Sequence, residues 1–70
     1  MERTPVTSTM IRAVGYDAES KSLEIEFSNG GAAWLYSEVP AEEYEALMKA
    51  DSVGRYFLAR IKDKYPATKL

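Results

Sequence analysis

FSNGGAAWLYSEVP, residues 27–40, is the stretch that decides the fold. Within it, Asn29-Gly30 adopts the positive φ angles of a tight hairpin turn at little cost. Trp34 and Tyr36 stand two positions apart, so on a strand their rings point to the same face of the sheet. Pro40 suits the first turn of a helix, where its missing N–H costs nothing. We therefore expect a hairpin around this turn and helices after it.

The clearest strand pattern precedes the turn. Leu23, Ile25 and Phe27 alternate with two glutamates, Glu24 and Glu26. This period of two is typical of a strand that is buried on one side. One face of the predicted sheet is therefore apolar, whereas the other carries carboxylates.

The register of the hairpin decides where the two aromatic rings point. A two-residue turn pairs Ile25 with Trp34 and places both rings on the apolar face. A four-residue loop pairs Phe27 with Trp34 and has the same result. A three-residue loop or a bulge would instead turn the rings outward, beside the carboxylates. We favour burial, because each ring removes a large apolar area from water.

A first strand and two helices complete the pattern. The strand is expected over residues 10–16, with a bulge near Ala13 or Gly15 that brings Ile11 and Val14 onto one face. The first helix begins at Pro40 and has an apolar stripe. The second helix runs from residue 53 to about residue 65, where a proline ends it.

The sequence thus predicts an α+β fold, with a three-stranded antiparallel sheet in β-β-β-α-α order and both helices on one face. The domain is expected over residues 9–66, and residues 1–8 and 67–70 are expected to be flexible tails. The residues predicted to be mostly buried are Leu23, Ile25, Phe27, Trp34, Tyr36, Tyr44, Leu47, Phe57 and Ile61.

The composition narrows the class of protein. The 70 residues suffice for one domain, and their 46% apolar and 29% charged residues are typical of a soluble globule. The absence of cysteine excludes thiolate metal sites, and the absence of histidine removes the commonest general base. No apolar run approaches the ~20 residues of a membrane span, and no signal peptide is seen. We expect a cytoplasmic, non-enzymatic protein with no cofactor and no membrane partner.

The charges are divided along the chain. Residues 1–54 contain four Lys and Arg against ten Asp and Glu, whereas residues 55–70 contain five against one. Such a basic end would orient the molecule toward an anion, although a pI near 5.0 disfavours indiscriminate binding to nucleic acid. The other interpretation is a solvated helix whose cations interact with its own C-terminal dipole.

Several short motifs follow one another along the chain. They are Ser8-Thr9-Met10-Ile11, Val14-Gly15-Tyr16-Asp17, the alternating residues 23–27, the segment 34–40, Tyr44, Ser52-Val53-Gly54-Arg55-Tyr56-Phe57 and Ile61-Lys62-x-Lys64-Tyr65-Pro66. In this order and spacing they resemble the KTSC domain. That domain is a short module found at the C-terminus of some bacterial lysyl-tRNA synthetases and as a free-standing protein. The resemblance covers residues 8–66 and implies a stand-alone member.

The chain departs from the family pattern at a few positions. Trp34 stands where tyrosine is usual, and Leu58 stands where asparagine is usual. Val53 replaces an expected basic residue, and Ala32-Ala33 replaces more polar or basic positions. In some bacteria the module is fused to a tRNA-charging enzyme. The resemblance therefore implies weak RNA binding, with a tRNA or a single-stranded RNA as the partner.

A candidate anion site lies at the start of the second predicted helix. Ser52 followed by Gly54 leaves backbone N–H groups accessible to an anion. Arg55 would clamp a phosphate, and Tyr56 would stack on a base. The simpler interpretation makes Ser52 an N-cap and Gly54 an allowance for close packing. The residues of the predicted RNA or anion site are Ser52, Gly54, Arg55, Tyr56, Arg60, Lys62 and Lys64.

Two other surfaces are candidates. Trp34 and Tyr36 have the spacing of a stacking platform for single-stranded RNA, but carboxylates beside outward rings would repel phosphates, so we favour core packing. The acidic sheet face, with Arg12, Glu24 and Glu26, or an exposed edge strand would instead suit a protein partner. The alternative function is therefore that of a protein–protein interaction module.

Overall fold

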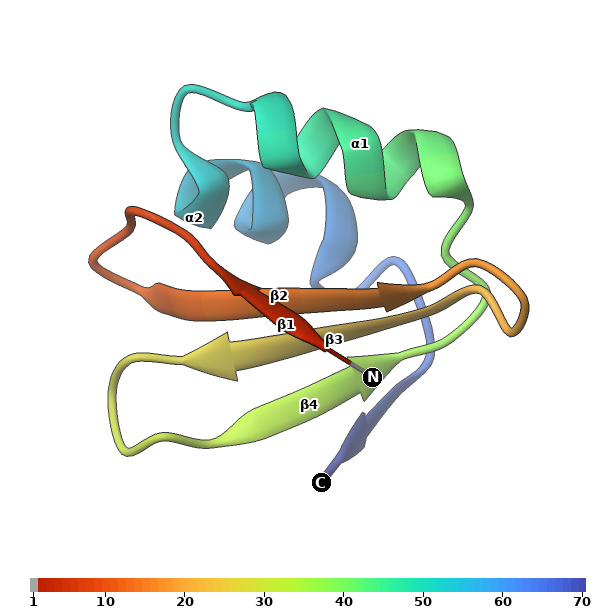
Figure 1. Cartoon of the computed structure of the whole chain (residues 1–70), viewed down its shortest axis with the longest axis horizontal. Coiled ribbons are helices and arrows are strands. Elements are labelled where there is room, and N and C mark those ends of the chain that lie inside the picture. Colours follow the sequence, from red (N-terminus) through yellow and green to blue (C-terminus); the bar gives the residue numbers. More distant parts are fainter. Residues whose placement is uncertain (1) are drawn as a thin grey trace.

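The protein consists of a sheet that is covered on one face by helices. Its structure, a computed structural model, describes residues 2–70. Five antiparallel strands lie in the order β1-β2-β3-β4-β5, and the helices lie together on one side of them (Figure 1). The elements are β1 (Arg3–Pro5), β2 (Ile11–Asp17), β3 (Ser22–Phe27), β4 (Ala33–Tyr36), α1 (Ala41–Lys49), α2 (Val53–Tyr56), η1 (Phe57–Ile61) and β5 (Ala67–Lys69).

The α+β class is confirmed, but the predicted number of three strands is wrong. β1 pairs with β2 and places Thr4 opposite Val14, and β5 pairs with β4 and places Thr68 opposite Leu35. Each added strand has only three residues, so no alternation marks it in the sequence. Backbone hydrogen bonds to the edges of β2 and β4 hold both strands in place.

The two added strands lie in the segments that were expected to be flexible tails, outside residues 9–66. Met1, which belongs to the first of these segments, lies outside the described residues. The mobility of both segments stays a prediction, and it is testable by the hydrogen exchange of their amides.

A bulge sets the faces of β2, as expected near Ala13. Ile11 lies opposite Phe27 and Val14 lies opposite Ile25, and the register shifts between residues 11 and 13. Because of this shift, the side chains of Ile11 and Val14 both reach the core, where they are fully buried.

The hairpin between β3 and β4 has the register of the two-residue turn. Ile25 lies opposite Trp34, which is one of the pairings considered for this hairpin, and Trp34 packs against the core on the favoured face. The positive φ angles belong to Gly30 (80°) and Gly31 (68°) rather than to Asn29. The two residues of the turn that adopt left-handed backbone angles are therefore both glycines. Glycine has no Cβ atom, so it adopts these angles with less strain than asparagine does.

One apolar core lies between the sheet and the helices. Most residues predicted for it are buried, and Phe27, Trp34 and Tyr44 are half-buried against it. The partial burial of Trp34 leaves part of its indole at the surface. The buried cluster consists of Ile11, Val14, Leu23, Ile25, Tyr36, Val39, Leu47, Val53, Phe57 and Ile61.

The second helix is shorter than expected. α2 continues into η1, a wider turn in which the N–H of Lys62 donates to the carbonyl of Phe57 (2.9 Å). Lys62 then has a ψ of 132° and Asp63 a φ of 67°, because the chain must return to the sheet to form β5. Lys62 and Lys64 therefore follow the helix instead of lying on it. Neither this helix nor any other within residues 2–70 is long and apolar enough to cross a membrane.

Candidate ligand-binding site

The start of α2 is engaged in internal contacts. The Oγ atom of Ser52 accepts a hydrogen bond from the N–H of Arg55 (3.3 Å), which is the arrangement of an N-cap. Gly54 is buried, and a Cβ atom added there would lie 3.3 Å from Oγ of Ser8 and 3.5 Å from Cβ of Met10. The backbone of this first turn is therefore packed against the segment before β2.

Tyr56 is turned toward α1. Its hydroxyl donates a hydrogen bond to Oε1 of Glu43, and the hydroxyl of Tyr65 donates to Oε2 of the same carboxylate (2.8 Å). The bond to Glu43 raises the pKa of Tyr56. Burial, followed by the bond to Glu43, raises the pKa of Tyr65 to about 12. Tyr56 thus joins two helices, and its hydroxyl is already occupied.

Four cationic side chains of the predicted site are exposed. None of the four forms an ion pair with a carboxylate within residues 2–70. Their charges are therefore available to an anion from solution. These side chains are Arg55, Arg60, Lys62 and Lys64.

The acidic sheet face carries its own counter-charges. Nη2 of Arg3 lies 2.7 Å from Oε1 of Glu24, and Nη1 of Arg3 lies 3.4 Å from Oε1 of Glu26. Arg12 approaches the other oxygen of Glu26 at 3.5 Å. Two arginines thus face two glutamates, which leaves this surface much less acidic than its carboxylates alone suggested.

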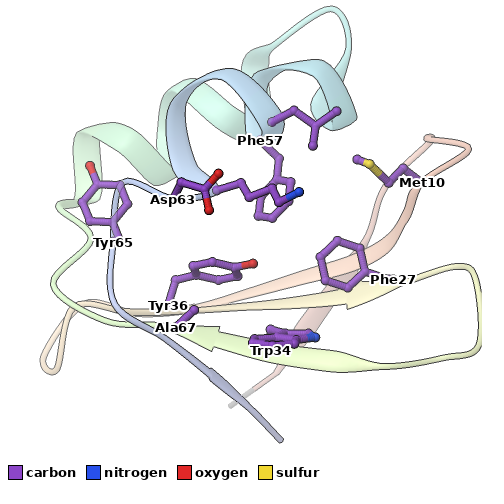
Figure 2. A pocket seen from close by; sticks show the side chains of 10 residues that line it. Met10, Phe27, Trp34, Tyr36, Phe57, Asp63, Tyr65 and Ala67 are labelled. Carbon is purple, nitrogen blue, oxygen red and sulfur yellow. The ribbon is translucent and has the colours of Figure 1, made fainter.

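A cavity of about 440 Å³ opens between the sheet and the end of the second helix (Figure 2). Five of its ten lining residues are aromatic. The centroid of the Phe57 ring lies 5.5 Å from that of Phe27 and 5.4 Å from that of Tyr36, both in edge-on contacts. Trp34 lies on the sheet side of the cavity, across from Phe57. Phe57 thus contacts two other rings of the cavity, whereas the indole has no ring partner within residues 2–70.

Polar groups line the same cavity. Lys62 and Asp63 are exposed and come from the turn after η1. The hydroxyl of Tyr36 points into the cavity in Figure 2. Burial, together with the negative charge of Asp63, raises the pKa of Tyr36.

A second hollow of about 590 Å³ adjoins the aromatic cavity. Met10 and Leu58 line both, and Arg55 and Ser8 lie in the second. Leu58 is 52% exposed and contributes an apolar side chain to this surface. The two hollows therefore form one surface with Leu58 between them, Lys62 on one side and Arg55 on the other.

Sequence reasoning missed most residues of the aromatic cavity. Met10, Phe27, Leu58 and Asp63 belong to segments far apart in the chain, and only the fold brings them together. The available signals were Lys62, which belongs to the predicted anion site, and the spacing of Trp34 and Tyr36, for which core packing was favoured.

The family model of the KTSC domain matches residues 7–65. The chain belongs to the KTSC domain family. An uncharacterized protein of Stutzerimonas stutzeri is 47% identical over 57 residues, which cover 81% of this chain and 79% of that protein. A protein of Tsukamurella paurometabola is 41% identical over 66 residues, which cover 94% of this chain and 97% of its own length. These relatives have nearly the length of this KTSC domain.

A solved structure has the same fold. The crystal structure of a KTSC domain protein from Yersinia pestis matches with a TM-score of 0.94 and 38% sequence identity. The match covers 99% of this chain and 96% of the other. Because the coverage is nearly complete, the matched region of this KTSC domain includes both β1 and β5.

Proposed function

We propose that this KTSC domain is a non-enzymatic module that binds RNA, with the cations of residues 55–64 contacting phosphates. One observation carries the proposal. The cations of this segment are exposed and have no carboxylate partner within residues 2–70, whereas Arg3 and Arg12 are ion-paired. A free cation that contacts a phosphate releases a condensed counterion, and this release is the main source of non-specific affinity for nucleic acid.

The placement of two cations favours a single strand over a duplex. Arg55 and Lys62 lie in adjoining hollows that share Leu58. A strand that crosses Leu58 would therefore meet a cation on each side. Aromatic walls between two cations are typical of surfaces that bind unpaired nucleotides. The ion-paired glutamates of the opposite sheet face offer a protein partner little net charge.

The test is a titration of a fluorescent single-stranded RNA, followed by anisotropy at several salt concentrations. Each phosphate contact to a single strand contributes about −0.7 to the slope of log K against log salt. The combined variant Arg55→Glu, Lys62→Glu should therefore lower the magnitude of the slope by about 1.4 and weaken binding at low salt. A labelled tRNA in parallel shows whether a folded RNA binds as well.

The matched control is Lys21→Glu combined with Lys49→Glu. It changes the net charge by the same amount, and neither lysine lines the two hollows. The control should retain more of the binding and of the salt slope than the test variant. Equal losses in both variants would mean that only net charge matters. Absence of binding by the wild-type protein at low salt would rule out the proposed function and would direct the search to a protein partner.

A further inference from the structure

The aromatic cavity contains an open stacking surface. The indole of Trp34 is half-buried, lines the cavity and has no ring partner within residues 2–70. The ring of Phe57 makes edge-on contacts with the rings of Phe27 and Tyr36, and these contacts hold the three rings in place. A flat ligand would therefore meet a preformed slot. Stacking of one base on an aromatic side chain contributes about 1–3 kcal/mol to binding.

The polar groups of the cavity select among flat ligands. The carboxylate of Asp63 is an acceptor without an ion-pair partner within residues 2–70, although Lys62 is its neighbour in the chain. A carboxylate accepts two parallel hydrogen bonds from adjacent donors. Guanine offers two adjacent donors, N1–H and N2–H, on its Watson–Crick edge. Adenine and cytosine present a ring acceptor beside their amino group, and uracil presents carbonyls beside its N3–H. The hydroxyl of Tyr36 provides a further donor or acceptor for the base.

A cation also lines the cavity. Lys62 lines the cavity with Asp63, so the surface combines a positive group for a phosphate with a negative group for base donors. A purely apolar side chain of a protein partner would use neither charge. This charge complementarity favours a nucleotide as the occupant.

We infer that the aromatic cavity binds one unstacked nucleobase, guanine in preference to the others, with the base against Trp34 and its Watson–Crick edge toward Asp63. The inference rests on the proposed function, because it names the part of the RNA that this surface reads. Phosphate contacts by the cations supply affinity for any sequence, whereas the cavity supplies the preference for guanine.

The experiment is a titration of the isotope-labelled full-length protein with GMP, AMP, CMP, UMP and ribose 5-phosphate, followed by NMR. Trp34 is the only tryptophan, so its indole N–H gives a single assignable peak that reports on the cavity. GMP should shift this peak and the amide of Asp63, with an affinity about tenfold higher than that of UMP. Ribose 5-phosphate, which has no base, should leave the indole peak in place.

Asp63→Asn tests the carboxylate, and Glu19→Gln is its matched control. Asparagine tolerates the positive φ of residue 63, so the backbone is preserved. Both variants remove one negative charge, but Glu19 is exposed and lines neither hollow. Asp63→Asn should weaken the binding of GMP about tenfold, whereas Glu19→Gln should leave the binding of GMP unchanged. If Asp63→Asn does not fold, the ranking of the four nucleotides by the wild-type protein still decides.

The possible results separate this inference from the proposed function. Salt-dependent RNA binding together with an indole peak that GMP does not move would overturn the inference alone. A GMP-dependent shift without RNA binding would support the cavity and overturn the proposed function. Equal affinity for GMP and UMP would overturn the guanine preference. A cavity that takes up an apolar peptide and no nucleotide would be a protein-docking site.

Discussion

The hydroxyl of Tyr65 lies 2.8 Å from Oε2 of Glu43. This contact joins the segment after η1 to α1, and the hydroxyl of Tyr56 reaches the other oxygen of the same carboxylate. One glutamate therefore connects three parts of the helical layer. The connection also fixes the turn that contains Asp63, two positions before Tyr65, at the opening of the aromatic cavity.

The first prediction concerns this connection. Glu43→Ala should lower the free energy of unfolding by about 2 kcal/mol, because hydrogen bonds to charged groups contribute roughly 1.5–3 kcal/mol and these hydroxyls are partly solvated. The measurement is urea denaturation followed by tryptophan fluorescence. Glu42→Ala, an exposed neighbour in the same helical turn, is the control and should have little effect. Equal urea midpoints for the two variants would show that the hydrogen bonds to Glu43 do not stabilise the fold.

The second prediction concerns alkaline pH. The folded protein raises the pKa of Tyr65 from 10.0 to about 12, which favours the neutral phenol. The stability from this residue is therefore complete below pH 10 and is lost as the pH rises toward 12. Tyr65→Phe should be less stable than the wild-type protein at neutral pH and should lose less stability across this window. The thermal midpoint as a function of pH measures both effects, and parallel curves would contradict the prediction.

The third prediction concerns the ring contacts of the core. Phe57 is 2% exposed and meets the rings of Phe27 and Tyr36. Phe57→Ala should cost about 3–5 kcal/mol, enough to unfold much of so small a domain. Leu58→Ala is a control one position along the chain, because its side chain is 52% exposed and should cost far less. Circular dichroism during thermal unfolding compares the two, and a similar loss in both would contradict the packing described.

The fourth prediction concerns the two short strands at the edges of the sheet. The N–H of Val6 donates to the carbonyl of Arg12 (3.1 Å), and the N–H of Leu70 donates to that of Ala33 (2.9 Å). Both amides should exchange with deuterium more slowly than in an unstructured chain. They should exchange faster than the central amide of Ile25, because edge strands open locally. If the amide of Val6 exchanges at the rate of an unstructured chain, the N-terminal segment is flexible, as expected from the sequence.

The sequence identified the parts of the fold that depend on local pattern. The alternation from Leu23 to Phe27 placed β3, and Asn29-Gly30 placed its turn, whereas several loop lengths, each with its own register, were compatible with the sequence. The bulge in β2 followed from the phase of Ile11 against Val14. These features were predictable because side-chain burial on one face determines them.

The remaining features depend on contacts between distant residues. β1 and β5 have three residues each, which is too short for an alternation of apolar and polar side chains to mark them. The second helix was expected to reach about residue 65, but the chain leaves the helix after Ile61 to return to the sheet. The cations near Arg55 were visible in the sequence, whereas the cavity was not, because its lining comes from both layers.

The two terminal strands also have a consequence for solubility. Exposed sheet edges are templates on which another copy of a chain adds its own strands, and long edges promote aggregation. Here the outermost strands have three residues each, and Pro5 in β1 lacks an N–H to offer. A chain trimmed to residues 9–66 would instead expose the long, apolar β2 and the edge of β4. Such a trimmed protein should precipitate or form oligomers at concentrations where the whole chain stays monodisperse.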